Sequence, residues 1–324
     1  MISRNLTQFG LGIDAGGTAT RWALVSKNQT NEQCELVSQG QVIGLTGLLM
    51  STEDGQAQLA DAIRQIAHNA WNGDAAIRNN VQVFAGLTGL PDNTGQLHKH
   101  CASAFNVAPS RITLVSDIEL THRAHFEPGD GYIVYAGTGS YSSFIDIQRG
   151  LHRRGAHGGI LDDGGSGFWI AREALKQVWR REDEQSGQWR QSPMAEALFA
   201  QLGGSDWAHT RQFVYGQSNA QMRGRMGIMA TAVGATADRD TSAKNILVAA
   251  GKELARLGNI LCDQFGNRPI QFAGRVFDLH PIIFETARAT ITKENHHIIQ
   301  LSSTRSLAKI AAQIAVGQIG RAHV

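Results

Sequence analysis

Two glycine-rich segments of this sequence carry residues that could bind phosphate. Asp14-Ala15-Gly16-Gly17-Thr18-Ala19-Thr20 and Gly137-Thr138-Gly139-Ser140 each lie between two apolar runs. Converging N–H groups at a tight turn form an anion-binding concavity, and only glycine lets the backbone come so close to phosphate oxygens. We therefore predict two strand–turn–strand hairpins that hold the phosphates of ATP, through Gly16, Gly17, Thr18 and Thr20 in the first and Gly137, Thr138, Gly139 and Ser140 in the second.

The two segments match other types of glycine turn less well. Each segment alone could be an ordinary β-hairpin with a glycine turn. Neither contains the Gly-x4-Gly-Lys-Ser/Thr sequence of a Walker motif, and neither runs directly into a helix as a dinucleotide-binding turn does. The presence of two such segments favours phosphate binding, and their repetition suggests two related domains that each open with a phosphate-facing hairpin.

Asp14 ends the apolar run before the first hairpin. A bare carboxylate would repel phosphates there unless a cation lay between them. Mg²⁺ keeps several waters and bridges phosphate oxygens to one or two carboxylates. We predict that Asp14 binds Mg²⁺ through water, and a turn-forming aspartate is the alternative.

Asp117 follows the apolar run at residues 112–115, so it could cap a helix or project from the carboxyl end of a strand. Phosphoryl transfer to an alcohol needs a carboxylate that orients the hydroxyl and accepts its proton. Asp117 lies between the two hairpins in sequence, which makes it our predicted catalytic base. Asp162 and Asp163 are its rivals.

Residues 155–169 form a glycine-dense loop, a composition typical of backbone that bends around a ligand. Ser166 or Gly165 could begin a helix at residues 168–178 with a free N-terminus. A second turn, at residues 86–91, ends an apolar run. The predicted contacts of the acceptor substrate are Thr88, Asp117, Gly155, His157, Asp163 and Ser166, although His157 is equally well explained as an exposed loop residue.

The chain has 324 residues, more than one hydrophobic core usually serves, which predicts two domains. Strand and helix patterns alternate, which predicts an α/β fold with mixed sheets. We place the domains at residues 1–117 and 118–324, and we expect a terminal helix near residues 307–318 that could pack back on the first domain.

The overall composition excludes several classes of protein. Hydrophobic residues at 42% and charged residues at 18% are typical of a folded globular chain, and a net charge of +2 gives no support for binding nucleic acid. Apolar stretches are far shorter than the roughly 20 residues of a membrane span, and the first ten residues do not resemble a secretory leader. The three cysteines are isolated and indicate neither disulfides nor a thiolate metal site. We expect a soluble cytoplasmic protein.

The ordered series of motifs resembles the N-acetylglucosamine kinase branch of the BadF/BadG/BcrA/BcrD ATPase family, within the actin-like ATPase superfamily. The series comprises the two hairpins, residues 86–89, 116–117 and 163–169, and Gly274-Arg275-Val276-Phe277. The resemblance implies a two-domain actin-like (ribonuclease H-like) fold with an interdomain cleft. It also implies phosphorylation of an amino sugar, N-acetylglucosamine or glucosamine, at its 6-hydroxyl by Mg-ATP, with Asp117 as base, Gly274 near the adenosine, and a homodimer.

The sequence departs from the family pattern in the loop expected to bind the sugar. His157 stands where family members commonly have tryptophan, Asp162 replaces a glycine, and Gly164 replaces a glutamate. The acceptor therefore stays open at this point. Two alternatives are a BadF-type activase, which would need cluster-binding cysteines, and a non-catalytic nucleotide or sugar sensor.

Overall fold

The computed structural model describes residues 7–17, 19–28, 33–216, 219–291, 298–300 and 306–318. The chain divides into two compact units, with residues 1–124 and 304–324 in unit 1 and residues 125–303 in unit 2. The predicted boundary at Asp117 falls on the first residue of α4 (Asp117–Arg123), a helix that packs on the sheet of unit 1. Within the described segments, no helix is both long enough and apolar enough to cross a membrane.

The described part of unit 1 is built on a five-stranded sheet with the strand order β3-β2-β1-β4-β5. Its strands are β1 (Gln8–Ala15), β2 (Ala19–Lys27), β3 (Cys34–Ile43), β4 (Val81–Leu87) and β5 (Ile112–Ser116). The pairs β1–β2 and β2–β3 are antiparallel, whereas β1–β4 and β4–β5 are parallel. The carboxyl ends of β1, β4 and β5 consequently meet at one edge, where Ala15 pairs with Leu87 and Leu87 pairs with Ser116.

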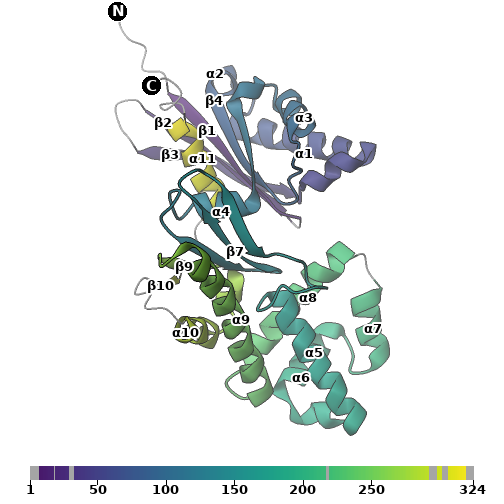
Figure 1. The fold of residues 1–324 in the computed structure, drawn as a ribbon. Helices are drawn as coiled ribbons and strands as arrows, with labels where there is room; N and C mark the ends of the chain where they lie inside the picture. The colour runs from purple at the N-terminus through teal and green to yellow at the C-terminus, as the bar shows by residue number, and fades with distance from the viewer. Residues whose placement is uncertain are drawn as a thin grey trace, which may run out of the picture. The chain divides into compact units, whose positions relative to one another are not determined.

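Helices cover both faces of this sheet (Figure 1). The helices of unit 1 besides α4 are α1 (Glu53–Trp71), α2 (Ala75–Asn80), α3 (Gly95–Phe105) and α11 (Leu307–Gln318), with short 3₁₀ turns η1 (Gly47–Ser51) and η2 (Pro109–Arg111). Neighbouring residues of β4 point to opposite faces: Val83 packs in the core under α1 and α3, and Phe84 packs with α4 and α11.

Helix α11 lies directly on the backbone of β1. A Cβ atom at Gly12 would lie only 2.0 Å from the carbonyl oxygen of Ala308, and one at Gly10 only 2.1 Å from that of Ala312. The helix presents alanines to the sheet, so two backbones approach more closely than larger side chains would allow.

The described part of unit 2 has a sheet with the order β10-β9-β6-β7-β8. Its strands are β6 (Tyr132–Ala136), β7 (Ser140–Ile145), β8 (Leu151–Gly155), β9 (Ile270–Ala273) and β10 (Ile298–Gln300). The pairs β6–β7 and β7–β8 are antiparallel, and β6–β9 and β9–β10 are parallel. Both sheets thus have the same strand order and directions, the relation that the repeated hairpins suggested.

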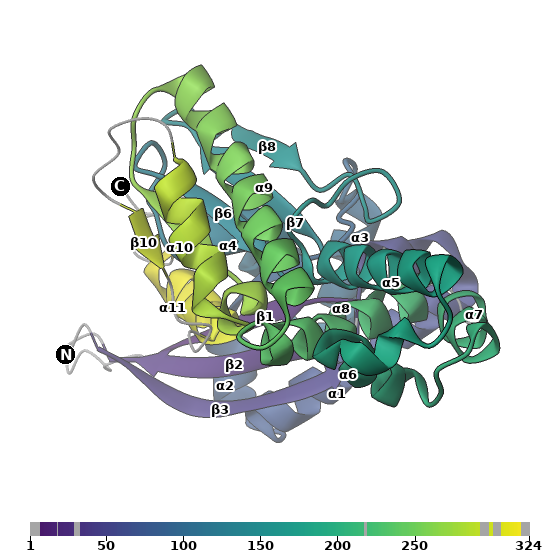
Figure 2. The same cartoon turned by 90° about the horizontal axis from the view of Figure 1, so that it is seen from below.

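The helices of unit 2 are α5 (Gly167–Glu184), α6 (Pro193–Leu202), α7 (Trp207–Tyr215), α8 (Asn219–Thr236), α9 (Thr241–Phe265) and α10 (Pro281–Thr290), with 3₁₀ turns η3 (Gln188–Gln191) and η4 (Arg275–Asp278). Figure 2 shows α9 and α10 side by side, and α5, α6 and α8 gathered into a helical group. The α/β class with two mixed sheets is therefore confirmed.

Candidate active site

The first hairpin is a tight turn between β1 and β2. The Gly16 N–H donates to the carbonyl oxygen of Ala19 at 3.2 Å, which closes the turn, and Thr18 lies outside the described residues. The loop after β3 lies against this turn, because a Cβ atom at Gly44 would be 2.2 Å from the carbonyl oxygen of Gly17. Gly16 and Gly17 thus form a turn supported from behind by a second segment.

Thr20 lies behind this turn. Its side chain is fully buried, and its Oγ1 accepts a hydrogen bond from the Leu45 N–H at 3.0 Å. This bond ties the hairpin to the loop after β3. The predicted contact of Thr20 with phosphate stays a prediction.

Asp14 is the penultimate residue of β1, and its Cα is paired with Gly86 on β4 and with Arg21 on β2. Burial raises the pKa of the Asp14 carboxyl, the positive charge of Arg21 opposes that rise, and the negative charge of Asp117 adds to it. The two carboxylates are therefore close enough to repel each other. A cation at Asp14 would relieve that repulsion, so the residues present fit a magnesium site.

Asp117 is the first residue of α4 and does not cap it. Ser116 is the cap, because its hydroxyl accepts from the Glu119 N–H at 3.1 Å. The Asp117 carboxylate instead accepts at Oδ2 from the Thr88 hydroxyl, at 2.7 Å, and at Oδ1 from the N–H of Ile118, at 3.0 Å. The alternative prediction, that Asp117 caps the helix, is wrong.

Thr88 connects Asp117 to the first hairpin. Its N–H donates to the carbonyl oxygen of Ala15 at 3.0 Å, while its hydroxyl holds Asp117. Beside Thr88 lies a cavity of about 550 Å³, between η1 and residues 89–97. Thr88 therefore fixes the carboxylate at the edge of the sheet, and the next residues line a hollow of ligand size.

The second hairpin closes with the Gly137 N–H donating to the carbonyl oxygen of Gly139 at 2.9 Å. Ser166 caps α5 by accepting from the Trp169 N–H, which confirms the predicted helix start. The predicted free N-terminus is wrong, however. The N–H groups of Gly167 and Phe168 donate to the carbonyl oxygens of Gly137 and Thr138, at 2.8 and 3.3 Å, because the turn directs these acceptors toward the helix.

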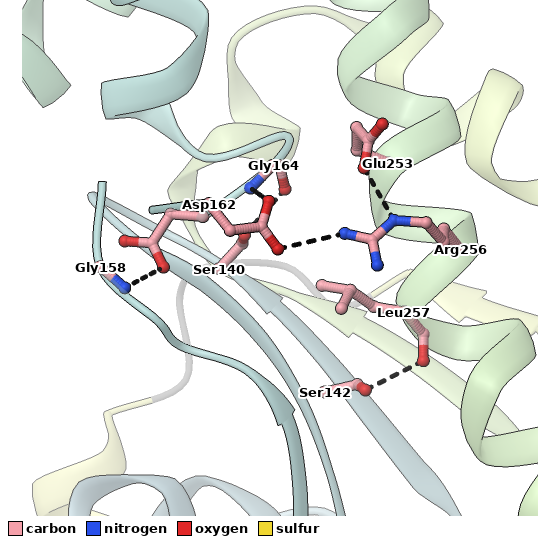
Figure 3. A network of polar contacts seen from close by, with 9 residues as sticks. Ser140, Ser142, Gly158, Asp162, Gly164, Glu253, Arg256 and Leu257 are labelled. Carbon is pink, nitrogen blue, oxygen red and sulfur yellow. Dashed lines mark hydrogen bonds and ion pairs between the residues drawn. The ribbon is translucent and has the colours of Figure 1, made fainter. Parts of the chain in front are cut away.

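Ser140 and Gly155 join the glycine-dense loop to the second hairpin. The buried hydroxyl of Ser140 donates to the carbonyl oxygen of Gly164 at 2.7 Å (Figure 3). Gly155 has φ = 74°, a left-handed value that favours glycine, and the next residue, Ala156, donates its N–H to the Ser140 carbonyl oxygen at 2.9 Å. The loop therefore folds back against the hairpin.

Asp163 is buried beneath the second hairpin, with its side chain 1% exposed. Its Oδ1 accepts from the Gly158 N–H at 3.1 Å, and its Oδ2 lies 3.3 Å from Nη2 of Arg223 on α8. Burial raises the pKa of the Asp163 carboxyl, although the Gly158 N–H and Arg223 act to lower it. His157 is exposed and interacts with Asp163 electrostatically.

Asp162 and Gly164, two of the residues that differ from the family pattern, both lie against α9. Figure 3 shows Asp162 directed toward Arg256, with Oδ2 3.3 Å from Nη2, while Oδ1 accepts from the Gly164 N–H at 3.1 Å. The Nε of Arg256 also donates to Glu253 at 2.8 Å. A Cβ atom at Gly164 would lie 2.9 Å from the Glu253 carboxylate, so a glutamate there would meet a like charge at close range.

Gly274 lies beside the second hairpin. Its φ is 104°, and a Cβ atom there would lie 2.2 Å from the carbonyl oxygen of Ala136, the residue before Gly137. Glycine is required because the chain leaving β9 crosses the end of β6. The predicted adenosine contact of Gly274 remains untested.

The structure brings the predicted residues together in two groups, one in each unit. Unit 1 gathers Asp14, Gly16, Gly17, Thr20, Thr88 and Asp117, and unit 2 gathers Gly137–Ser140, Gly155, Asp163, Ser166 and Gly274. Two charged neighbours of these residues, Arg21 beside Asp14 and Arg223 beside Asp163, were not predicted from the sequence. Arg21 could have been found from the antiparallel register with Asp14, whereas no sequence signal connects Arg223 to residue 163.

The cysteines do not form a cluster site. Cys101 and Cys262 are buried, Cys34 is half-buried, and burial raises the pKa of the Cys101 thiol to about 12. Within the described ranges, no three His, Cys, Asp or Glu side chains form a metal cage. Ligands beyond Asp14 for Mg²⁺ would be phosphate oxygens and water, as is usual for this ion.

Two sheets of this order, each opening with a glycine hairpin, form the actin-like ATPase fold. The chain belongs to the BadF/BadG/BcrA/BcrD ATPase family, whose sequence profile matches residues 11–298. No curated protein sequence matches the chain.

Solved structures confirm the fold. A candidate N-acetylglucosamine kinase from Porphyromonas gingivalis superposes with a TM-score of 0.73 at 18% identity, over 95% of this chain and 98% of that chain. One from Chromobacterium violaceum gives 0.71 at 19%, over 95% and 99%. A ROK family glucokinase from Streptomyces griseus, bound to glucose and AMPPNP, gives 0.54 at 14%, over 96% and 98%.

Proposed function

We propose that this protein transfers the γ-phosphoryl group of ATP to the 6-hydroxyl of an amino sugar, N-acetylglucosamine or glucosamine. The observation that carries the proposal is the Asp117 carboxylate, held by Thr88 and by the Ile118 N–H at the sheet edge where the first hairpin begins. A fixed carboxylate beside a phosphate-binding turn is the arrangement that phosphoryl transfer to an alcohol needs.

Asp117 orients the acceptor hydroxyl and takes its proton as the oxygen bonds to the γ-phosphorus. The bond between that phosphorus and the β–γ bridging oxygen breaks, ADP leaves, and Asp117 later gives the proton to water. Asp14 would hold Mg²⁺ through water, and the ion would neutralise part of the phosphate charge. Glycine N–H groups of the hairpins bind the remaining phosphate oxygens.

Support for an amino sugar comes from the family and from the acceptor side of the site. The two superposed structures described as candidate N-acetylglucosamine kinases cover nearly the whole chain. The 550 Å³ cavity beside Thr88 lies in the size range of small-molecule sites. The loop tied down by Asp162 and Arg256 differs from the family pattern, so we leave N-acetylglucosamine and glucosamine as alternatives.

A BadF-type activase is disfavoured, because a cluster shared between subunits would need accessible cysteines and two of the three are buried. A non-catalytic sensor would bind ATP without turnover. The homodimer and the cytoplasmic location remain predictions.

The test is ADP release by the purified protein with a panel of hexoses and hexosamines. Asp117→Asn is the inactive variant, and Asp61→Asn, which alters an exposed carboxylate on α1, is the matched control. We expect ADP only with amino sugars, and only from the wild type and Asp61→Asn. ATP binding without ADP release would identify a sensor, and bound iron–sulfur would identify an activase.

A further inference from the structure

Helix α8 contributes a positive charge to the second hairpin. Arg223 and Gly227 are four residues apart and lie on the same face of this helix. A Cβ atom at Gly227 would lie 3.2 Å from Oγ1 of Thr138, so the helix packs directly against the turn. One turn earlier on that face, Arg223 reaches Asp163.

The guanidinium lies against the turn as well. A Cβ atom at Gly139 would lie 2.8 Å from Oδ2 of Asp163 and 3.7 Å from Nη2 of Arg223. Glycine at position 139 therefore leaves room for the Asp163–Arg223 pair to close on the hairpin. The turn Gly137–Ser140 has no charged side chain of its own. Arg223 therefore brings a positive charge to a turn that is predicted to bind anions.

The two members of the pair differ in exposure. The Asp163 side chain is 1% exposed, whereas that of Arg223 is 45% exposed. A guanidinium has five N–H donors in a planar fork, and Asp163 accepts from one of its nitrogens. Arg223 thus keeps donors for a second anion, and arginine forks match phosphate in two-bond geometry.

We propose that Arg223 binds a phosphate group of the nucleotide at the second hairpin, and that Asp163 is the positioning residue that holds its guanidinium there. This inference rests on the proposed function, because it assumes that nucleotide phosphates occupy the hairpins. The competing role for Arg223 is only to neutralise a buried carboxylate.

The experiment compares Arg223→Gln and Arg223→Lys with Arg225→Gln. Arg225 is the matched control, because it lies on the same helix but stacks on the ring of Phe213, 4.1 Å from its centroid. Direct titration measures the affinity for ATP, ADP and adenosine without sugar, and thermal melting monitors folding.

We expect Arg223→Gln to weaken ATP binding by about 10- to 100-fold, the effect of losing a charged hydrogen bond, while adenosine binding stays unchanged. Arg223→Lys should recover part of the affinity, since it restores charge but not the fork. Arg225→Gln should bind ATP like the wild type.

Several outcomes would overturn the inference. If Arg223→Gln binds ATP as tightly as the wild type, or loses ATP and adenosine equally, Arg223 does not contact phosphate. That result would leave the proposed function intact as long as the wild type releases ADP with an amino sugar. If the wild type binds ATP but phosphorylates no sugar, only the proposed function fails. If it binds no ATP, both fail.

Discussion

The two glycine hairpins have the same strand–turn–strand form and the same position in matching sheets, yet different charged side chains surround them. Asp14 and Asp117 lie at the first, where burial and the negative charge of Asp117 raise the pKa of Asp14 and Arg21 opposes that rise. At the second, a buried aspartate holds an arginine against the turn. Under the proposed function, the same type of turn has two roles: unit 1 would supply groups for a cation and a proton, and unit 2 would supply donors for an anion.

The hairpins also differ in their support. The strand leading to the first hairpin rests on the alanines of α11, whereas the carbonyl oxygens of the second hairpin accept from N–H groups at the N-terminus of α5 and the hairpin also contacts α8. Because of this difference, substitutions at the two hairpins should have different effects on stability and on ATP affinity.

The largest effect should come from Asp117→Asn. The amide oxygen can still accept from the Ile118 N–H, and the amide NH₂ can donate to the Thr88 hydroxyl, but the group no longer takes a proton, so we expect kcat for sugar phosphorylation to fall by about 10²- to 10⁴-fold. ATP affinity should change little, as measured by direct titration. If kcat stayed unchanged in this variant, Asp117 would not be the proton acceptor.

Gly12→Ala should destabilise unit 1 by about 3 kcal/mol, because the new Cβ meets the backbone of α11 at 2.0 Å. Denaturant unfolding measures this loss. Gly317→Ala, on the same helix but facing open space, is the control and should be neutral or slightly stabilising. Equal effects of the two would show that α11 does not support β1.

Alanine in each turn compares the hairpins directly. A Cβ atom at Gly139 meets Asp163 at 2.8 Å, so Gly139→Ala should lower stability by about 1 to 2 kcal/mol and weaken ATP binding. At Gly17 the nearest atom is a Thr46 methyl at 3.8 Å, so Gly17→Ala should fold normally and lose only ATP affinity. Loss of stability in both variants would contradict this contrast.

Asp163→Asn should have only a small effect on folding. The amide keeps an acceptor for the Gly158 N–H and removes a buried charge, so the free energy of unfolding should stay within about 1 kcal/mol of the wild type. ATP affinity should fall, because Arg223 loses its anchor. Retained ATP affinity would leave Asp163 with a structural role only.

The same variant has a defined pH dependence. The native pKa of Asp163 is raised, so the folded protein binds this proton more tightly than the unfolded chain, whose pKa is about 3.9. The contribution of Asp163 to stability therefore falls as pH rises from about 4 through the raised pKa. Arg223, Asp162 and His157 face this carboxyl, and the stability of Asp163→Asn relative to the wild type should increase over that window.

Much of the fold could be predicted from the sequence because it follows local pattern. Glycines and hydroxyl residues between apolar runs indicated both hairpins, and the predicted start of α5 at Ser166 or Gly165 is met by Ser166. Local pattern failed where the tertiary surroundings decide. The N–H groups at the N-terminus of α5 donate to carbonyl oxygens of residues 137 and 138, thirty positions earlier. The domain boundary at Asp117 and the roles of the site residues remain predictions.

By itself, the sequence determined the turn chemistry, the α/β class and the family, and it favoured Asp117 over Asp162 and Asp163 as the predicted base. Only the tertiary structure decided what each side chain faces. Ser116 caps α4, and Asp117 instead accepts a hydrogen bond from Thr88. Thr20 and Ser140 are buried behind their turns, and Arg223 pairs with Asp163, 60 residues away in sequence. The physical reason is that backbone conformation depends on near neighbours, whereas burial and charge depend on packed elements that sequence distance does not reveal.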